Sequence, residues 1–210
     1  MKQESIQVPI ARTSLKEEDF KSVLEPLRSG WLVQGPKVKE FEKQWSDFTG
    51  CSYSVAVTSC TSALQLSLIA AGFKAGDEAI VPAFTWVSTA NVVELLGGKV
   101  IFCDIELNTF NIDVSKIEAL ITERTKAIIP VHLFGLAADM TEIMRLSEKY
   151  NLAIIEDAAC GFGCFYNGKH VGNLGHTGCF SFHPRKSITT GEGGMITTND
   201  EDVMNRLKML

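Results

Sequence analysis

A lysine in the segment FSFHPRKSITTGEGGM, residues 180–195, stands where it could act as a nucleophile. The segment CFSF before Lys186 is strand-like and apolar, and a glycine turn after it leads into another apolar segment, MITT. An ammonium group held where water is scarce loses its proton more readily, and the free amine can form a Schiff base with a carbonyl compound. Most lysines are exposed and unreactive, so this segment alone also fits an ordinary surface lysine.

Hydroxyl-bearing residues follow a second strand-like segment, in SVAVTSCTSALQL, where we expect a helix to begin near Thr61 or Ser62. The free N–H groups and the positive dipole end of a helix N-terminus bind phosphate well. Serine and threonine are also the usual capping residues, so the segment equally fits a simple capping turn.

An acidic pair and a tryptophan also follow apolar segments. Glu156 and Asp157 end the run IIED, where a carboxylate could contact a cationic ring nitrogen, bind a metal or cap the next turn. The lack of neighbouring metal ligands weakens the second option. Trp86, in PAFTWVSTAN, could offer its flat face to a planar ligand or belong to the core. Together with the lysine and the phosphate site, these groups meet the requirements of pyridoxal 5′-phosphate (PLP), which we expect as cofactor.

The elements that would carry these residues alternate along the chain from residue 54 onward. Short apolar segments such as EAIV, KAIIPV and LAIIEDAA are separated by helical patterns such as TSALQLSLIAAG and MTEIMRLSEKY. Strands separated in this way pair in parallel through crossovers, so we predict an α/β fold, a three-layer sandwich with a mostly parallel central sheet. Ligands of such sheets bind beyond the carboxyl ends of the strands, which is where the residues above are expected.

Helical patterns flank this alternating region. Before it, GP at residues 35–36 opens a helix whose apolar stripe we expect in the core: Val38, Phe41, Trp45 and Phe48. At the other end, NDEDVMNRLKML begins a helix with an apolar stripe that no later segment covers. We therefore expect the chain to stop inside a larger protein.

Composition argues against several classes of function. The 210 residues are 45% hydrophobic, enough for a sizeable core, and 20 basic against 25 acidic residues give a net charge of −5. The sequence has no dense basic run, no signal-peptide pattern and no apolar stretch near the roughly 18 residues of a membrane span. We therefore expect a cytoplasmic protein with no nucleic-acid or membrane partner. The cysteines form no CxxC pair and the histidines lack ligand spacing, so we expect reduced thiols and no metal site.

The order of these segments closely resembles one family of enzymes. The blocks run from about residue 8 to the end of the chain: SGWLVQGPKVKEFEKQW, SCTSALQLSLIAAGFKAGDEAIVPAFTWVSTANVV, FCDIELNTFNID, TKAIIPVHLFG, IIEDAACGFG and FSFHPRKSITTGEGGMITTND. They appear in the same order in the DegT/DnrJ/EryC1/StrS sugar aminotransferases, which are fold-type-I PLP enzymes. The resemblance implies that residues 1–210 are the N-terminal and large cofactor-binding domain, and that the family's small C-terminal domain is absent from this chain.

The resemblance also implies roles for individual residues. Lys186 would bind the cofactor covalently and then move a proton between the substrate carbon and the cofactor. Asp157 would pair with the ring nitrogen and keep it protonated. Trp86 would stack on the ring, and three hydroxyl-bearing residues would hold the phosphate: Thr61, Ser62 and Ser181.

Two positions depart from the family pattern. Cys60 stands where the family usually has glycine, so the phosphate-binding turn must accommodate a side chain. Cys160 stands where a glutamine or histidine commonly lies near the phenolic oxygen of the cofactor, so we count Cys160 among the cofactor neighbours and expect a changed contact there.

The implied reaction moves an amino group from an amino acid, L-glutamate in this family, to the keto sugar of a nucleotide-sugar. The product would serve polysaccharide, lipopolysaccharide or amino-sugar biosynthesis, and the resemblance implies a homodimer that shares its active sites.

Three alternatives stay open at this point: a noncatalytic PLP-binding or regulatory relative, a PLP-dependent sugar dehydratase and a nicotinamide oxidoreductase. Relatives that dehydrate replace the lysine by histidine, whereas Lys186 is present. No GxGxxG follows the first strand, which argues against the oxidoreductase.

Overall fold

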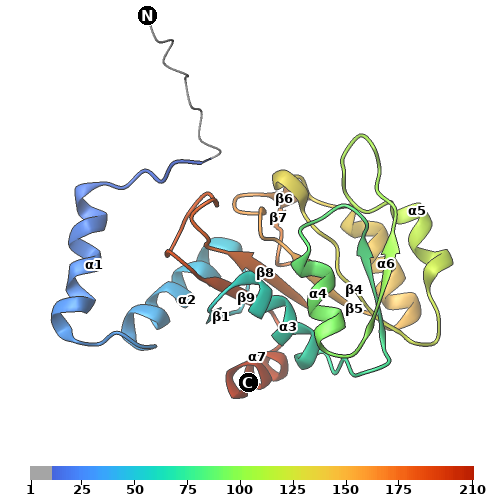
Figure 1. The fold of residues 1–210 in the computed structure, drawn as a ribbon, viewed down its shortest axis with the longest axis horizontal. Helices are drawn as coiled ribbons and strands as arrows, with labels where there is room; N and C mark the ends of the chain where they lie inside the picture. Colours follow the sequence, from blue (N-terminus) through green and yellow to red (C-terminus); the bar gives the residue numbers. More distant parts are fainter. Residues whose placement is uncertain (1–10) are drawn as a thin grey trace, which may run out of the picture.

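The computed structural model describes residues 11–210, which form one central sheet with helices on both faces (Figure 1). Within these residues the main sheet has seven strands, in the order β1-β9-β8-β5-β4-β2-β3. They are β1 (Tyr53–Val57), β2 (Glu78–Pro82), β3 (Lys99–Cys103), β4 (Thr125–Ile128), β5 (Ala153–Asp157), β8 (Thr177–Ser181) and β9 (Gly194–Thr198). A separate hairpin contains β6 (Phe165–Tyr166) and β7 (Lys169–His170).

Only β9 runs against the common direction of the main sheet, which confirms the predicted mostly parallel arrangement. β2 pairs in parallel with β3 and β4, β4 with β5, and β5 with β8. β9 is antiparallel to both of its neighbours, β8 and β1. Residues 182–193 join β8 to β9 without a crossover helix, so the chain simply reverses between them. This connection carries Lys186.

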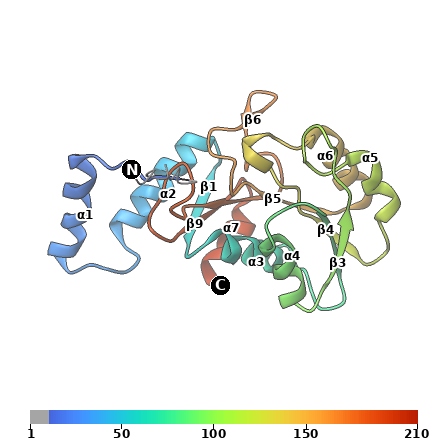
Figure 2. The same ribbon diagram turned by 45° about the horizontal axis from the view of Figure 1, so that its top comes forward.

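Helices cover both faces of the sheet, as predicted. They are α1 (Glu17–Ser29), α2 (Pro36–Thr49), α3 (Cys60–Ala70), α4 (Ser88–Leu95), α5 (Val114–Ile117), α6 (Met140–Tyr150) and α7 (Glu201–Met209), with single 3-10 turns at η1 (Glu118–Leu120) and η2 (Leu133–Gly135). α3, α4 and α7 pack on one face, and α2, α5 and α6 on the other (Figure 2). No helix within residues 11–210 has the length and apolar character needed to cross a bilayer.

Alternate strand residues pack into opposite layers. On β2, Ala79 and Val81 join the cluster of α3, α4 and α7, whereas Ile80 joins the cluster of α5 and α6. On β5, Ile155 and Ile154 divide in the same way. A strand has a side-chain period of two, so a sheet buried on both faces requires the continuous apolar runs found in the sequence.

The predicted apolar stripe of α2 is only partly in the core. Trp45 is 4% exposed and packs against Phe180 and Phe182, with ring centroids 5.0 and 4.9 Å away. Phe48, by contrast, is 46% exposed and stacks on Phe162 at 5.1 Å. Phe162 is itself 40% exposed, so this pair lies at the surface; the core expectation holds for Trp45 and is wrong for Phe48.

Candidate active site

A cavity of about 450 Å³ lies at the carboxyl ends of the central strands. It is lined by segments that follow β1, β2 and β5, by the end of β8, and by the connection from β8 to β9. Six of the seven residues predicted from sequence line it: Thr61, Trp86, Asp157, Cys160, Ser181 and Lys186. Ser62 does not line the cavity, because its hydroxyl lies against those of Thr58 and Ser59, 3.0 Å from each.

The carboxylate of Asp157 is buried at the end of β5 and still lines this cavity. Its side chain is 4% exposed; Oδ2 accepts a hydrogen bond from Thr89 Oγ1 at 2.8 Å, and Oδ1 accepts one from the Ala159 N–H at 3.1 Å. Burial raises the pKa of Asp157 above its ordinary value, although these hydrogen bonds and the nearby Lys186 charge oppose the shift. No basic side chain within residues 11–210 forms an ion pair with Asp157, so a cationic group entering the cavity would supply the missing partner.

The neighbouring Glu156 points to the opposite side of the sheet and serves the fold. Its carboxylate contacts His132 Nε2 at 2.9 Å and accepts hydrogen bonds from the N–H groups of Gly172, Leu174 and Gly175 at 2.6 to 2.8 Å. Complete burial works against ionisation of Glu156, but the His132 contact and the backbone hydrogen bonds outweigh it and hold the pKa of Glu156 below its ordinary value. The two adjacent carboxylates therefore have different tasks.

Replacing Glu156 with alanine is expected to destabilise the fold by about 3–5 kcal/mol, because several buried donors lose their acceptor. The lowered pKa of Glu156 means that its stabilising effect is present above its ordinary pKa and is lost as the pH falls through the lower folded value. Urea unfolding at neutral and acidic pH measures both effects. Glu142→Gln, on the exposed face of α6, is the control and should change stability by less than about 1 kcal/mol. An equal effect of the two substitutions would contradict this account.

The turn between β1 and α3 presents free N–H groups to the cavity. α3 begins at Cys60, earlier than expected, and Ser59 is its N-cap, with Ser59 Oγ accepting from the Ser62 N–H at 3.0 Å. Several hydroxyl-bearing residues in this run could cap a helix. Because β1 ends at Val57, the helix begins soon after it and Ser59 is the cap. The N–H groups of Cys60 and Thr61 have no hydrogen-bond partner within the described residues. They form a ready-made anion site.

Two features allow this turn to pack tightly. A Cβ atom added to Gly194, the first residue of β9, would lie 2.4 Å from the carbonyl carbon of Ser59, so glycine is required there. The side chain of Cys60 turns toward β8, with Sγ 3.5 Å from the carbonyl oxygen of Cys179 and 4.0 Å from Asp157 Oδ1. The cysteine is therefore accommodated without disturbing the turn, and it places a thiol beside the buried carboxylate.

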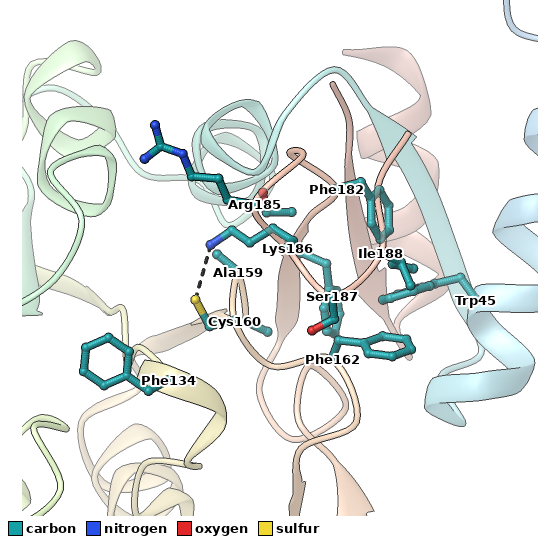
Figure 3. A pocket seen from close by; sticks show the side chains of 13 residues that line it. Trp45, Phe134, Ala159, Cys160, Phe162, Phe182, Arg185, Lys186, Ser187 and Ile188 are labelled. Atoms are coloured by element: carbon teal, nitrogen blue, oxygen red, sulfur yellow. Dashed lines mark hydrogen bonds between the residues drawn. The ribbon is translucent and has the colours of Figure 1, made fainter. Parts of the chain in front are cut away.

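Lys186 reaches the cavity from a turn in the connection between β8 and β9. The backbone N–H of Lys186 donates to the carbonyl oxygen of His183 at 2.8 Å. The side-chain Nζ of Lys186 lies 3.2 Å from Cys160 Sγ (Figure 3). A second, smaller cavity of about 290 Å³ lies beside the first and is also lined by Lys186 and Cys160, with Phe162 and Trp45 on its apolar side (Figure 3). The lysine amine therefore stands between two open spaces, at a point that a ligand in either one can reach.

Trp86 is not a core residue. Its side chain is 73% exposed, at the mouth of the larger cavity and just before α4. An exposed indole that lines a cavity leaves a flat apolar surface free for a planar ligand.

Cys160 is expected to be the first thiol that iodoacetamide alkylates. It is exposed beside the Lys186 amine, whereas Cys103 and Cys179 are buried, and burial raises the pKa of Cys103 to about 11. Saturating PLP at ten times its Kd should slow Cys160 alkylation about tenfold by occupying the cavity. Peptide mass spectrometry measures the rate at each cysteine, with Cys103 as the control. An unchanged Cys160 rate would show that PLP does not occupy this cavity.

The fold and the cavity first define a class, the large domains of sugar aminotransferases. A candidate sugar aminotransferase of Streptococcus pneumoniae in its PLP form superposes with a TM-score of 0.89 at 33% identity, over 97% of this chain and 56% of that one. The GDP-4-keto-6-deoxy-D-mannose-3-dehydratase of E. coli, with bound hydrated PLP, superposes with a TM-score of 0.91 at 33% identity, over 97% of this chain and 54% of that one. Within residues 11–210, no group of three or more potential ligand side chains could hold a metal ion.

The particular family follows from the sequence comparison. The chain belongs to the DegT/DnrJ/EryC1/StrS aminotransferase family, whose profile matches residues 13–210. It is 43% identical over 203 residues to the UDP-4-amino-4-deoxy-L-arabinose--oxoglutarate aminotransferase of Shewanella sediminis. That alignment covers 97% of this chain and 52% of the relative, so the chain spans about half the length of the curated relatives it matches.

Proposed function

We propose that this chain is the large, cofactor-binding domain of a PLP-dependent nucleotide-sugar aminotransferase. The observation that carries the proposal is that one cavity joins a buried carboxylate without a basic partner, a lysine amine and a helix N-terminus with free N–H groups. These are the groups that a cationic ring nitrogen, a carbonyl and a phosphate require, so the donor set fits PLP. PLP, when bound, supplies an electron sink for the amino-transfer chemistry.

The residues of the cavity have separate tasks in this proposal. Thr61 and Ser181, with the free N–H groups at the start of α3, bind the phosphate, while Ser62 supports the turn behind them. Trp86 covers one face of the ring. Asp157 keeps a proton on the ring nitrogen, because a buried carboxylate strongly favours a cationic neighbour. Lys186 holds the cofactor covalently and then moves a proton at the substrate carbon.

Cys160 is the remaining cofactor neighbour in this proposal. Its thiol lies 3.2 Å from the amine of Lys186, on the side of the cavity where the cofactor carbonyl would meet the lysine. A thiol is a weaker hydrogen-bond donor than an amide or an imidazolium. Cys160 would therefore contact the phenolic oxygen of the cofactor only weakly.

We propose L-glutamate as amino donor and the keto sugar of a nucleotide-sugar as acceptor. Support comes from the Shewanella relative, whose name pairs a UDP-linked amino sugar with oxoglutarate. The relatives are about twice as long, so we also propose that the complete protein has a small C-terminal domain that helps to close the site.

We further propose that the complete protein is a homodimer. α1 has no buried residue, and its apolar stripe is exposed: Phe20, Val23, Leu24 and Leu27. The helix stands away from the sheet (Figure 1), and its link to α2 includes the surface ion pair between Glu25 and Lys37 at 3.1 Å. An apolar stripe of this kind needs a covering surface, and the partner subunit would supply one. Light scattering on the full-length protein measures the oligomeric state.

A test of the function uses the full-length protein with bound PLP. L-Glutamate should convert the visible absorbance of the bound cofactor to that of its aminated form, and a keto-sugar nucleotide should then restore it. Absence of any conversion would favour the noncatalytic alternative. The dehydratase alternative predicts loss of water from the sugar without net amino transfer, which mass spectrometry of the product distinguishes. The presence of Lys186 argues for amino transfer.

A further inference from the structure

A buried hydroxyl of α4 lies close to two residues that line the larger cavity, Trp86 and Asp157. Thr89 is fully buried in the first turn of α4, behind the wall of the cavity. Its Oγ1 lies 2.8 Å from Asp157 Oδ2, 3.1 Å from the carbonyl oxygen of Trp86 and 3.2 Å from Thr85 Oγ1. The hydroxyl thus contacts both the element that carries the indole and the end of β5.

The Thr89 hydroxyl has one proton to donate, and it donates this proton to Asp157. The Asp157 oxygen is both nearer and able to carry charge, and charge-assisted hydrogen bonds are about twice as strong as neutral ones. The carbonyl oxygen of Trp86 already accepts a hydrogen bond from the Thr89 N–H at 3.1 Å. Thr89 Oγ1 can accept the proton of Thr85 in turn. The hydroxyl is therefore oriented toward Asp157.

Each oxygen of the Asp157 carboxylate accepts a hydrogen bond from the protein. Thr89 binds Oδ2 and the Ala159 N–H binds Oδ1 at 3.1 Å, which leaves further lone pairs on each oxygen for a ligand. Without Thr89 the side chain could rotate, and the carboxyl group would lose the strongest single influence that favours its ionised form.

We infer that Thr89 is a positioning residue that orients Asp157 toward the ring nitrogen of the cofactor. The inference rests on the proposed function, because it assigns that ring-nitrogen contact to Asp157. Thr89 itself touches neither cofactor nor substrate; it acts through the Asp157 carboxylate.

The test measures binding of pyridoxamine 5′-phosphate to the full-length apoprotein, because this probe carries the ring nitrogen and the phosphate but cannot bond to a lysine. Thr89→Val should weaken binding roughly 10- to 100-fold, the effect of one lost hydrogen bond to a charged group. Thr89→Ser keeps the hydroxyl and should retain most of the affinity. Thr177→Val is the matched control, because Thr177 is 3% exposed and its hydroxyl has no partner within residues 11–210.

A second background separates a positioning role from a merely structural one. In Asp157→Asn protein, Thr89→Val should change affinity by less than about twofold, because the charged contact that Thr89 would orient is already absent. In wild-type protein the Thr89 hydrogen bond lowers the pKa of Asp157, so its loss in Thr89→Val should raise that pKa. The pH below which binding of the probe is lost should therefore be higher in Thr89→Val. If Thr89→Val does not fold, Thr89→Cys provides a weaker donor and should give an intermediate loss.

Equal losses in the two backgrounds, or a Thr89→Val affinity equal to that of Thr177→Val, would overturn the positioning role. Wild-type protein that fails to bind the probe would overturn the proposed function together with this inference. Normal wild-type binding with an unaffected Thr89→Val variant would overturn the inference alone.

Discussion

Lys186→Ala is expected to abolish covalent cofactor binding and to lower turnover of the full-length protein by about 10²–10⁴-fold or more, because it removes both the attachment point and the proton-transferring amine. Among the residues that line the larger cavity, Lys186 is the only lysine. Absorbance of the purified protein and the rate with L-glutamate and a keto-sugar nucleotide measure the two effects.

The matched control for Lys186→Ala is Lys169→Ala. Lys169 is exposed on the small β6–β7 hairpin and lines neither cavity, so its removal should leave both measurements unchanged. The melting temperature of the apoprotein should stay close to the wild-type value in both variants, because neither side chain belongs to a core cluster. Retention of a borohydride-reducible linkage in Lys186→Ala would show that another amine holds the cofactor.

Asp157→Asn is expected to weaken cofactor binding by about 10²–10⁴-fold, since leaving a buried charge without its partner costs about 3–5 kcal/mol. The asparagine keeps the shape of the side chain and can still accept a hydrogen bond from Thr89 or Ala159. The loss would therefore report on charge. A titration of apoprotein with pyridoxamine 5′-phosphate measures it, and an unchanged affinity would contradict the assignment of Asp157.

The same substitution should stabilise the apoprotein at neutral pH. Burial raises the pKa of Asp157, so the native state binds more protons than the unfolded state between the ordinary and the raised value. Stability from this group is complete below its ordinary pKa and is lost as the pH rises through the raised folded pKa. Asp157→Asn removes this dependence of the unfolding free energy on pH. A variant that binds cofactor poorly and yet resists urea better than wild type would show that Asp157 is held for function at the expense of stability.

Much of the architecture could be predicted because local pattern determines it. The apolar runs of β2 and β5 are continuous, and a strand buried on both faces requires this, so the parallel sheet follows from neighbouring segments alone. The order β1-β9-β8-β5-β4-β2-β3 does not follow, because it depends on which helices pack across the whole molecule. The hairpin of β6 and β7 had a local signal, Asn167-Gly168, with φ of 48° and 80°, that the sequence interpretation did not use.

In the candidate site, too, some features follow from the local sequence and others depend on the whole fold. Asp157 and Glu156 are adjacent, and the strand period of two already places them on opposite faces, but only the packing shows which one meets the cavity. The run of hydroxyls before α3 indicated an anion site, yet Ser59 and not a later residue caps the helix. Thr89 could be noticed in the sequence as a threonine shortly after Trp86. Its hydrogen-bond acceptor, Asp157, lies 68 positions away in the sequence. Contacts over such separations arise from the topology.

The most direct measurement is to locate the cofactor on the chain. Full-length protein purified with PLP is reduced with borohydride, digested and mapped by mass spectrometry. We expect one phosphopyridoxyl group, on the peptide that contains Lys186. A modification at a different lysine, or an unmodified Lys186 peptide in protein that is active with PLP, would contradict it.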